Sequence, residues 1–193
     1  MTYETSQVTP LTTTIGAEIG GVDLSKPLGN HQFNEVHDAL MAHQVIFFRC
    51  QDITPEQQIP FAKRFGDIHH HPYMQGMDDY PDILEIVKEP GDIYTFGAAW
   101  HTDQMFNPKP AMATMLYAHD TPSAGGDTMF AHMYDAYAAL SDGTKAILAD
   151  VNTWCGGRQH GRRAARHAST AAVATTSKAP LEHPAESHRT PAR

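Results

Sequence analysis

The sequence predicts an α+β fold, or a β-sandwich decorated with helices, formed by one domain. Short apolar segments of strand length recur at 44–49, 83–88 and 111–117. Helix-start signals at Thr54 and Ser141 lie between or after these segments. The chain has 193 residues, 41% of them hydrophobic, which is enough for one core. Short strands with helices at one end are typical of both architectures.

The N-terminal part is expected to hold a strand, a helix and a second strand. Residues 13–24, in which Gly recurs, are predicted to form a strand and turn. Asn30 is predicted to cap a helix over 31–43. The buried face of that helix is expected to carry Phe33, Val36, Leu40 and Met41. The apolar segment 44–49 is predicted to be a buried strand.

A second helix has a clear start signal. Thr54 is expected to cap it, Pro55 suits its first turn, and Gln57 completes a capping box. Gly66 is expected to end the helix.

The rest of the body is predicted to continue with strands, turns and then helices. Residues 83–88 are expected to form a strand and 89–92 a turn. A strand over 111–117 is followed by a loop through Pro122, Gly125 and Gly126, and then by a strand-like segment over 127–131. Helices are expected over 134–140 and from the cap Ser141 through Leu148.

The composition changes near Cys155. Every Phe, Tyr, Trp, Ile and Met precedes it, and residues 1–155 carry 7 Lys and Arg against 20 Asp and Glu. Residues 156–193 carry 7 basic and 2 acidic residues and few large aliphatics, so we expect a disordered basic tail rich in Ala and Arg. Two origins stay open: a tail that contacts an acidic partner, or the product of a reading-frame shift near 154–156. GC-rich DNA read out of frame yields this composition.

Charge and segment composition also bear on partners and location. The acidic body argues against nucleic acid as a partner, so such binding would reside wholly in 156–193. The sequence has neither a run of 18 apolar residues nor a secretory pattern at its N-terminus. Two cysteines are too few for a disulfide framework. We therefore expect a cytoplasmic protein with no membrane segment, and its oligomeric state, including a homo-oligomer, stays open.

His101 and Asp103, in the segment Trp-His-Thr-Asp, are candidate metal ligands. An imidazole and a carboxylate one residue apart can supply two ligands of a 2-His-1-carboxylate triad for Fe(II). With 13 His and 14 Asp in the chain, chance alone gives about 0.9 such pairs. By itself such a pair therefore more often marks a polar turn. The surrounding sequence is needed to distinguish a metal-ligand pair from a polar turn.

That neighbourhood resembles the TauD/TfdA family of dioxygenases. Six segments resemble family motifs in order, and the resemblance covers roughly residues 8–153: 15–24, 43–49, 65–69, 100–103, 122–128 and 136–141. Several ordered motifs are more specific than any one of them. The resemblance implies a double-stranded β-helix (jelly-roll, cupin-like) core with flanking helices, incomplete in this chain, and makes residues 1–155 the N-terminal part of a dioxygenase domain.

The resemblance also implies roles for individual residues. It implies Fe(II) held by His101, Asp103 and a distal His, with 2-oxoglutarate as co-substrate and Thr128 on one of its carboxylates. The other interpretation of Thr128 is a strand residue on a pleated surface. His71 and, more weakly, Tyr73 are implied to line the substrate pocket, although Tyr73 is also typical of half-buried packing. The three histidines at 69–71 are not expected to share one ion, because consecutive residues of an extended chain face opposite sides.

The implied reaction hydroxylates a small anionic organic substrate, such as taurine or another sulfonate, with O₂ and decarboxylation of 2-oxoglutarate to succinate. The distal His and an Arg for 2-oxoglutarate are expected beyond position 193, as in a truncated or frameshifted chain. Two hypotheses follow. One is an active dioxygenase whose missing ligands come from another chain or from the tail. The other is a catalytically inactive truncated fragment or an interaction module.

Overall fold

The structure is a computed structural model of the whole chain. It describes residues 2–71, 74–93, 97, 99–104 and 107–151, and the backbone of 171–176. Its strands are β1 (Gln7–Pro10), β2 (Ala17–Gly20), β3 (Val45–Phe48), β4 (Ala113–Ala118) and β5 (Ala171–Thr176). Its helices are α1 (Asn30–His43), α2 (Pro55–Lys63), α3 (Met133–Ala138) and α4 (Asp142–Ala149).

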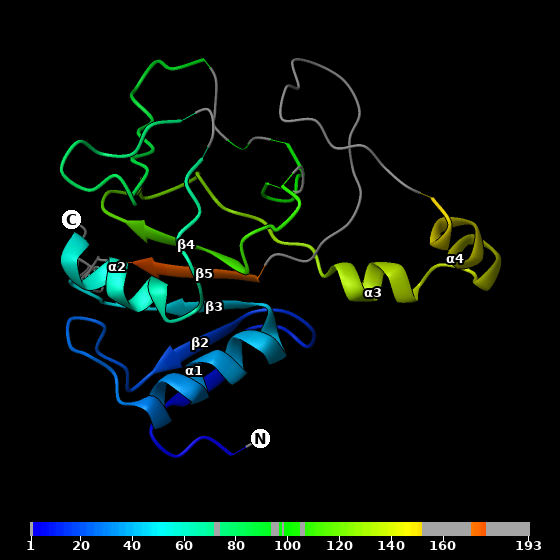
Figure 1. Ribbon diagram of the computed structural model, residues 1–193, viewed down its shortest axis with the longest axis horizontal. Helices are drawn as coiled ribbons and strands as arrows, with labels where there is room; N and C mark the ends of the chain where they lie inside the picture. The colour runs from blue at the N-terminus through cyan, green and yellow to red at the C-terminus, as the bar shows by residue number, and fades with distance from the viewer. Residues whose placement is uncertain are drawn as a thin grey trace, which may run out of the picture.

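The strands form one mixed sheet in the order β1-β2-β3-β5-β4. Strand β1 is antiparallel to β2, and the other pairs are parallel. Helices α1 and α2 lie against the sheet, whereas α3 and α4 extend away from it (Figure 1). The sheet and helices bear out the α+β class. Among the described helices, none has the length and apolar character needed to cross a membrane.

The core lies between α1, α2 and the sheet. Its largest fully buried side chains come from α1 and β3: Phe48, Leu40, Ile46 and Val36. Burial of each stabilises the fold by about 1.5–3 kcal/mol. The prediction of a buried strand over 44–49 is thus confirmed, and so is the apolar face of α1, with one exception. Met41 is 44% exposed, because it lies one position round the helix from the stripe that Leu40 completes.

The two predicted helix starts differ in outcome. The capping box of α2 is present, and the backbone N–H of Thr54 donates to Gln57 Oε1 at 2.8 Å. The cap predicted at Asn30 is wrong, because Gly29 occupies the N-cap position and Asn30 is already helical. The Asn30 side chain instead accepts a hydrogen bond from Arg64 Nη2 at 2.9 Å. The Asn30 side-chain oxygen, which was expected to cap the helix, is therefore bound by the guanidinium of Arg64, a residue distant in sequence.

The strand predicted over 83–88 is wrong in the described chain. The backbone N–H of Ile83 donates to the Tyr80 carbonyl, and the Ile83 carbonyl accepts from the Met77 N–H, both at 2.9 Å. A local loop thus uses backbone groups that a strand would offer to a neighbour. The turn over 89–92 is confirmed by the bond from the Asp92 N–H to the Glu89 carbonyl.

The later elements also divide into confirmed and wrong predictions. Strand β4 begins two residues after the predicted start, and α3 and α4 confirm the two expected helices. Ser141 caps α4, its hydroxyl accepting from the Thr144 N–H at 3.2 Å. The strand-like segment predicted over 127–131 has no regular structure in the described chain. Strand β1, a short exposed edge that ends in Pro10, was not predicted.

Strand β5 departs from the expected disorder of the tail. Its backbone pairs with β3 on one side and β4 on the other, from Val45↔Ala172 to Ala118↔Thr176. The segment Ala-Ala-Val-Ala-Thr-Thr contains one large aliphatic residue, so it lacks the usual apolar signal, although Val and Thr favour strands. The rest of 156–193 lies outside the described residues, as does Cys155.

Candidate metal centre

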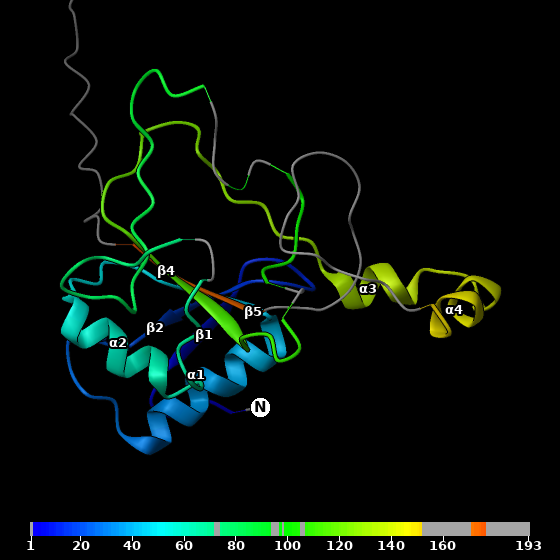
Figure 2. The ribbon, with the colours of Figure 1, turned by 45° about the horizontal axis from the view of Figure 1, so that its top comes forward.

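The segment that carries His101 and Asp103 leads into β4. Alternate residues of a strand point to opposite faces of its sheet. Ala113, Met115 and Tyr117 pack against the buried core, so Thr114 points to the other face. In Figure 2 the green part of the connection from α2 to β4 lies on the side of β4 that is away from the N-terminus.

His101 and Asp103 face each other across one intervening residue. His101 Nε2 lies 3.2 Å from Asp103 Oδ1, and the two side chains are 53% and 43% exposed. The structure thus brings the imidazole and the carboxylate into direct contact. Both groups remain accessible from solvent.

Each of the two side chains is held at its other polar atom. His101 Nδ1 lies 2.7 Å from the Ala99 carbonyl oxygen, so an N–H on Nδ1 donates to that oxygen. Asp103 Oδ2 accepts a hydrogen bond from the Thr114 hydroxyl at 2.8 Å. These contacts leave Nε2 and Oδ1 as the pair of atoms directed at one another.

The residue directly after Asp103 has an unusual backbone conformation. Gln104 has a left-handed backbone with φ of 50°, which is uncommon outside glycine. Its carbonyl accepts from the Asn107 N–H at 3.0 Å, which closes the turn. Gln104 Oε1 is buried and has no hydrogen-bond partner in the part of the chain that the structure describes.

The donor set fits part of a metal centre. An imidazole nitrogen and a carboxylate oxygen suit Fe(II), and ligands whose second polar atom is hydrogen-bonded are typical of metal sites. Within the described ranges, no group of three or more His, Cys, Asp or Glu side chains is gathered for one ion. The pair therefore fits two of the three protein ligands of a facial triad.

The other predicted site residues are placed less completely. Thr128 is exposed in the loop between β4 and α3, just after Gly125 and Gly126, whose φ values are 82° and 74°. His71 is half-buried, and Tyr73 lies outside the described residues.

The neighbouring histidines have separate partners. His69 Nδ1 lies 3.3 Å from Asn107 Nδ2, whereas His70 Nε2 lies 3.2 Å from Asp82 Oδ1. His69 and His70 thus have different partners on different segments of the chain.

One residue of the site was missed in the sequence. Thr114 lies 11 positions from Asp103 and has no motif of its own. The available signal was its place in a predicted strand, opposite the apolar residues on either side of it.

Comparison with known proteins identifies the family. The family described as taurine catabolism dioxygenase TauD, TfdA matches residues 7–190. An alkylsulfatase of Acinetobacter baylyi is 35% identical over 137 residues, covering 70% of this chain and 42% of that protein. An (S)-phenoxypropionate/alpha-ketoglutarate-dioxygenase of Delftia acidovorans is 31% identical over 163 residues, covering 75% and 52%. The chain thus spans about half the length of the curated relatives it matches.

Solved structures agree with this assignment. A taurine dioxygenase from Burkholderia xenovorans superposes with a TM-score of 0.62 at 30% identity, covering 76% of this chain and 52% of that one. AAD-2 in complex with Mn(II) and N-oxalylglycine, an analogue of 2-oxoglutarate, superposes with a TM-score of 0.55 at 32% identity, covering 76% and 50%. The chain therefore belongs to the TauD/TfdA family of dioxygenases, as its ordered motifs predicted.

Proposed function

We propose that His101 and Asp103 are two ligands of a non-haem Fe(II) centre in a 2-oxoglutarate-dependent dioxygenase. The observation that supports this most directly is the arrangement of the pair. His101 Nε2 and Asp103 Oδ1 are 3.2 Å apart, and each side chain is held at its other polar atom. The proposed reaction hydroxylates a small anionic substrate, such as taurine or another sulfonate, and converts 2-oxoglutarate to succinate.

The chemistry divides between the ion and the chain. When bound, Fe(II) lets O₂ decarboxylate 2-oxoglutarate to succinate and CO₂ while the second oxygen atom becomes the hydroxyl of the product. His101 binds as a neutral imidazole through Nε2, because Nδ1 keeps its proton on the Ala99 carbonyl. Asp103 adds one negative charge, so two ligands leave a divalent ion with net positive charge. That charge favours an anionic co-substrate at the same centre.

Three further residues take proposed roles in binding. The Thr128 hydroxyl, exposed in its loop, donates to one carboxylate of 2-oxoglutarate. His71 and Tyr73 line the pocket of the substrate, where a protonated imidazole suits a sulfonate or carboxylate. Relatives named for taurine and for phenoxypropionate, a sulfonate and a carboxylate, support an anionic substrate class.

We propose that the complete dioxygenase domain folds as a jelly roll. In this proposal the five-stranded mixed sheet forms one part of the jelly roll, and the additional length found in the relatives supplies its remaining strands. We propose that the third ligand, a histidine, and the arginine that pairs with 2-oxoglutarate come from another chain or from residues outside the described ranges. We also propose a cytoplasmic location.

A second candidate function is an interaction module without catalysis. It is favoured by large apolar side chains that are exposed between residues 86 and 151. These include Ile86, Val87, Ile93, Trp100, Met129, Tyr134 and Ile147. Contiguous exposed apolar patches are typical of surfaces that bind protein, and these residues are the candidates to form such a patch. Both candidates share the same family and differ in whether the iron centre is completed.

Calorimetry under anaerobic conditions separates the two candidates. The full chain is titrated with Fe(II), and succinate release is then measured with 2-oxoglutarate, O₂ and a panel of sulfonates. His101→Ala is the test variant, and His43→Ala, in the last turn of α1, is the matched histidine control.

The outcomes are distinct. Iron binding by wild type and His43→Ala but not by His101→Ala supports the metal centre. Substrate-dependent succinate release then supports the dioxygenase, and binding without succinate supports the second candidate. Wild-type binding no stronger than that of His101→Ala overturns the metal centre.

A further inference from the structure

We infer that Thr114 is a positioning residue for Asp103, and that its hydroxyl fixes which carboxylate oxygen is presented to a metal ion. The inference rests on the proposed function, because it concerns the same centre. It assigns a role to a β4 residue that no motif in the sequence marks.

The first support is the contact itself. The Thr114 hydroxyl donates to Asp103 Oδ2 at 2.8 Å, a normal length for an O–H···O hydrogen bond. Threonine donates only one hydroxyl proton, and here the carboxylate accepts it. Oδ1 is thereby left as the oxygen that faces His101 Nε2 at 3.2 Å.

The second support is the element that carries Thr114. It is an interior residue of β4 and is in register with Ala172 of β5, so its backbone is held by the sheet. Its side chain branches at Cβ, which restricts χ1. Neighbouring Ala113 and Met115 pack into the core on the opposite face. The hydroxyl is thus fixed in space by the sheet.

The third support is that the bond to Thr114 joins the segment carrying His101 and Asp103 to the sheet, whereas the other polar contacts of these two side chains, among the described residues, lie within the segment. Trp100 and His101 are both more than half exposed. The segment is held by the short contact from His101 to Ala99, which lies within it, and by the turn at Gln104. The bond to Thr114 is a contact between the ligand pair and the sheet. Supporting hydrogen bonds from rigid elements are what give metal ligands a defined orientation.

The hydroxyl therefore has a specific task. Without it, Asp103 can rotate about χ2 and exchange its two oxygens, and neither is preferentially presented beside His101 Nε2. We expect the loss of metal affinity that follows removal of a partner hydrogen-bonded to a ligand, about 10- to 100-fold. Unlike a packing defect, this loss follows the hydroxyl rather than the volume of the side chain.

Binding of Mn(II) to the full chain, measured by electron paramagnetic resonance of the free ion, tests this. The variants are Thr114→Val, which removes the hydroxyl and keeps the shape, and Thr114→Ser, which keeps the hydroxyl. Thr9→Val, at an exposed position of β1, is the matched control. The thermal unfolding midpoint without metal is recorded for each variant, and Thr114→Ala repeats the test if the valine variant does not fold.

We expect Thr114→Val to bind Mn(II) about 10- to 100-fold more weakly than wild type. Thr114→Ser and Thr9→Val should bind like wild type, and the valine variant should remain folded. Equal affinity of Thr114→Val and wild type overturns the inference and leaves the metal centre standing, as does a serine variant as weak as the valine variant. Wild-type binding no stronger than that of His101→Ala overturns the proposed function, and the inference with it.

Discussion

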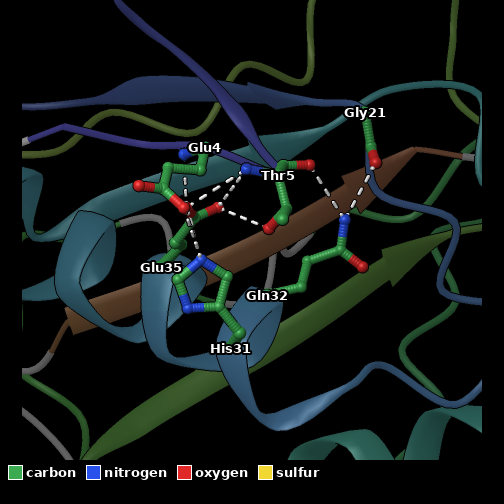
Figure 3. A network of polar contacts seen from close by, with 6 residues as sticks. All are labelled: Glu4, Thr5, Gly21, His31, Gln32 and Glu35. Carbon is green, nitrogen blue, oxygen red and sulfur yellow. Dashed lines mark hydrogen bonds and ion pairs between the residues drawn. The ribbon is translucent and has the colours of Figure 1, made fainter.

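The Glu35 carboxylate of α1 accepts hydrogen bonds from both the backbone N–H and the hydroxyl of Thr5. The two bonds reach Oε2 at 3.1 and 2.7 Å, and the Glu4 N–H also donates to this carboxylate (Figure 3). Gln32, one turn earlier, donates to the carbonyls of Thr5 and Gly21, each at 3.1 Å. These bonds tie the N-terminal segment to α1 and to the end of β2.

The same network sets the protonation of Glu35. Burial of the group opposes ionisation, but the hydrogen bonds from Glu4 and Thr5 outweigh it and lower the pKa of Glu35 from 4.5 to about 2. The partners donate to the charged carboxylate, and protonation would remove an acceptor that they need. His31 Nε2 lies 3.5 Å from carboxylate oxygens of both Glu4 and Glu35 and favours the same charged form when protonated.

We predict a pH-dependent contribution of Glu35 to stability. Its folded pKa is lower than its unfolded one, so the contribution is fully present above about pH 4.5 and is lost as pH falls toward 2. The difference in free energy of unfolding between wild type and Glu35→Gln should therefore shrink across that window. Urea denaturation at several pH values measures it, with Glu85→Gln, at an exposed site, as the control. A difference that stays constant from pH 6 to 2.5 contradicts the prediction.

The capping box of α2 yields a second prediction. Thr54→Ala removes the side-chain oxygen that accepts from the first turn and should lower the free energy of unfolding by about 1 kcal/mol. Thr54→Ser keeps the oxygen and should retain most of that stability. Urea denaturation of the three proteins measures the change. The prediction fails if serine and alanine are equally destabilising.

Core packing in β3 yields a third prediction. Ile46 is fully buried, and Ile46→Val removes one methylene and should cost about 0.5–1.5 kcal/mol of unfolding free energy. Ile147 of α4 is mostly exposed, so Ile147→Val should change stability by less than about 0.5 kcal/mol. Chemical denaturation of both variants provides the comparison, and equal effects at the two sites would contradict the assignment of the core to β3.

Metal-linked stability yields a fourth prediction. A ligand that binds only the folded state at about 100 times its Kd stabilises it by about 2.7 kcal/mol. Mn(II) should therefore raise the thermal unfolding midpoint of wild type, and EDTA should reverse the rise. Asp103→Asn should abolish most of this rise, whereas Asp120→Asn, in the exposed loop after β4, should keep it. An equal rise in both variants would place the ion elsewhere.

Features encoded within a few neighbouring residues could be predicted from sequence. The capping box at Thr54, the turn over 89–92 and the Ser141 cap depend on groups only three residues apart. The apolar segment of β3 was equally clear, because its burial needs no particular partner. The His101–Asp103 pair also follows from its spacing, since one intervening residue leaves both side chains able to meet.

Tertiary structure alone decided the features that need a distant partner. A strand exists only where a neighbour takes its hydrogen bonds, so 83–88 was predicted and forms a loop, whereas 171–176 was not predicted and forms β5 between β3 and β4. Likewise, the Asn30 side chain accepts a hydrogen bond from Arg64, which lies 34 positions away in the sequence, instead of capping α1. Sequence therefore determined the family, the spacing of His101 and Asp103, and the helix starts at Thr54 and Ser141. The fold decided that Thr114 holds Asp103, because only the sheet brings that hydroxyl to the carboxylate.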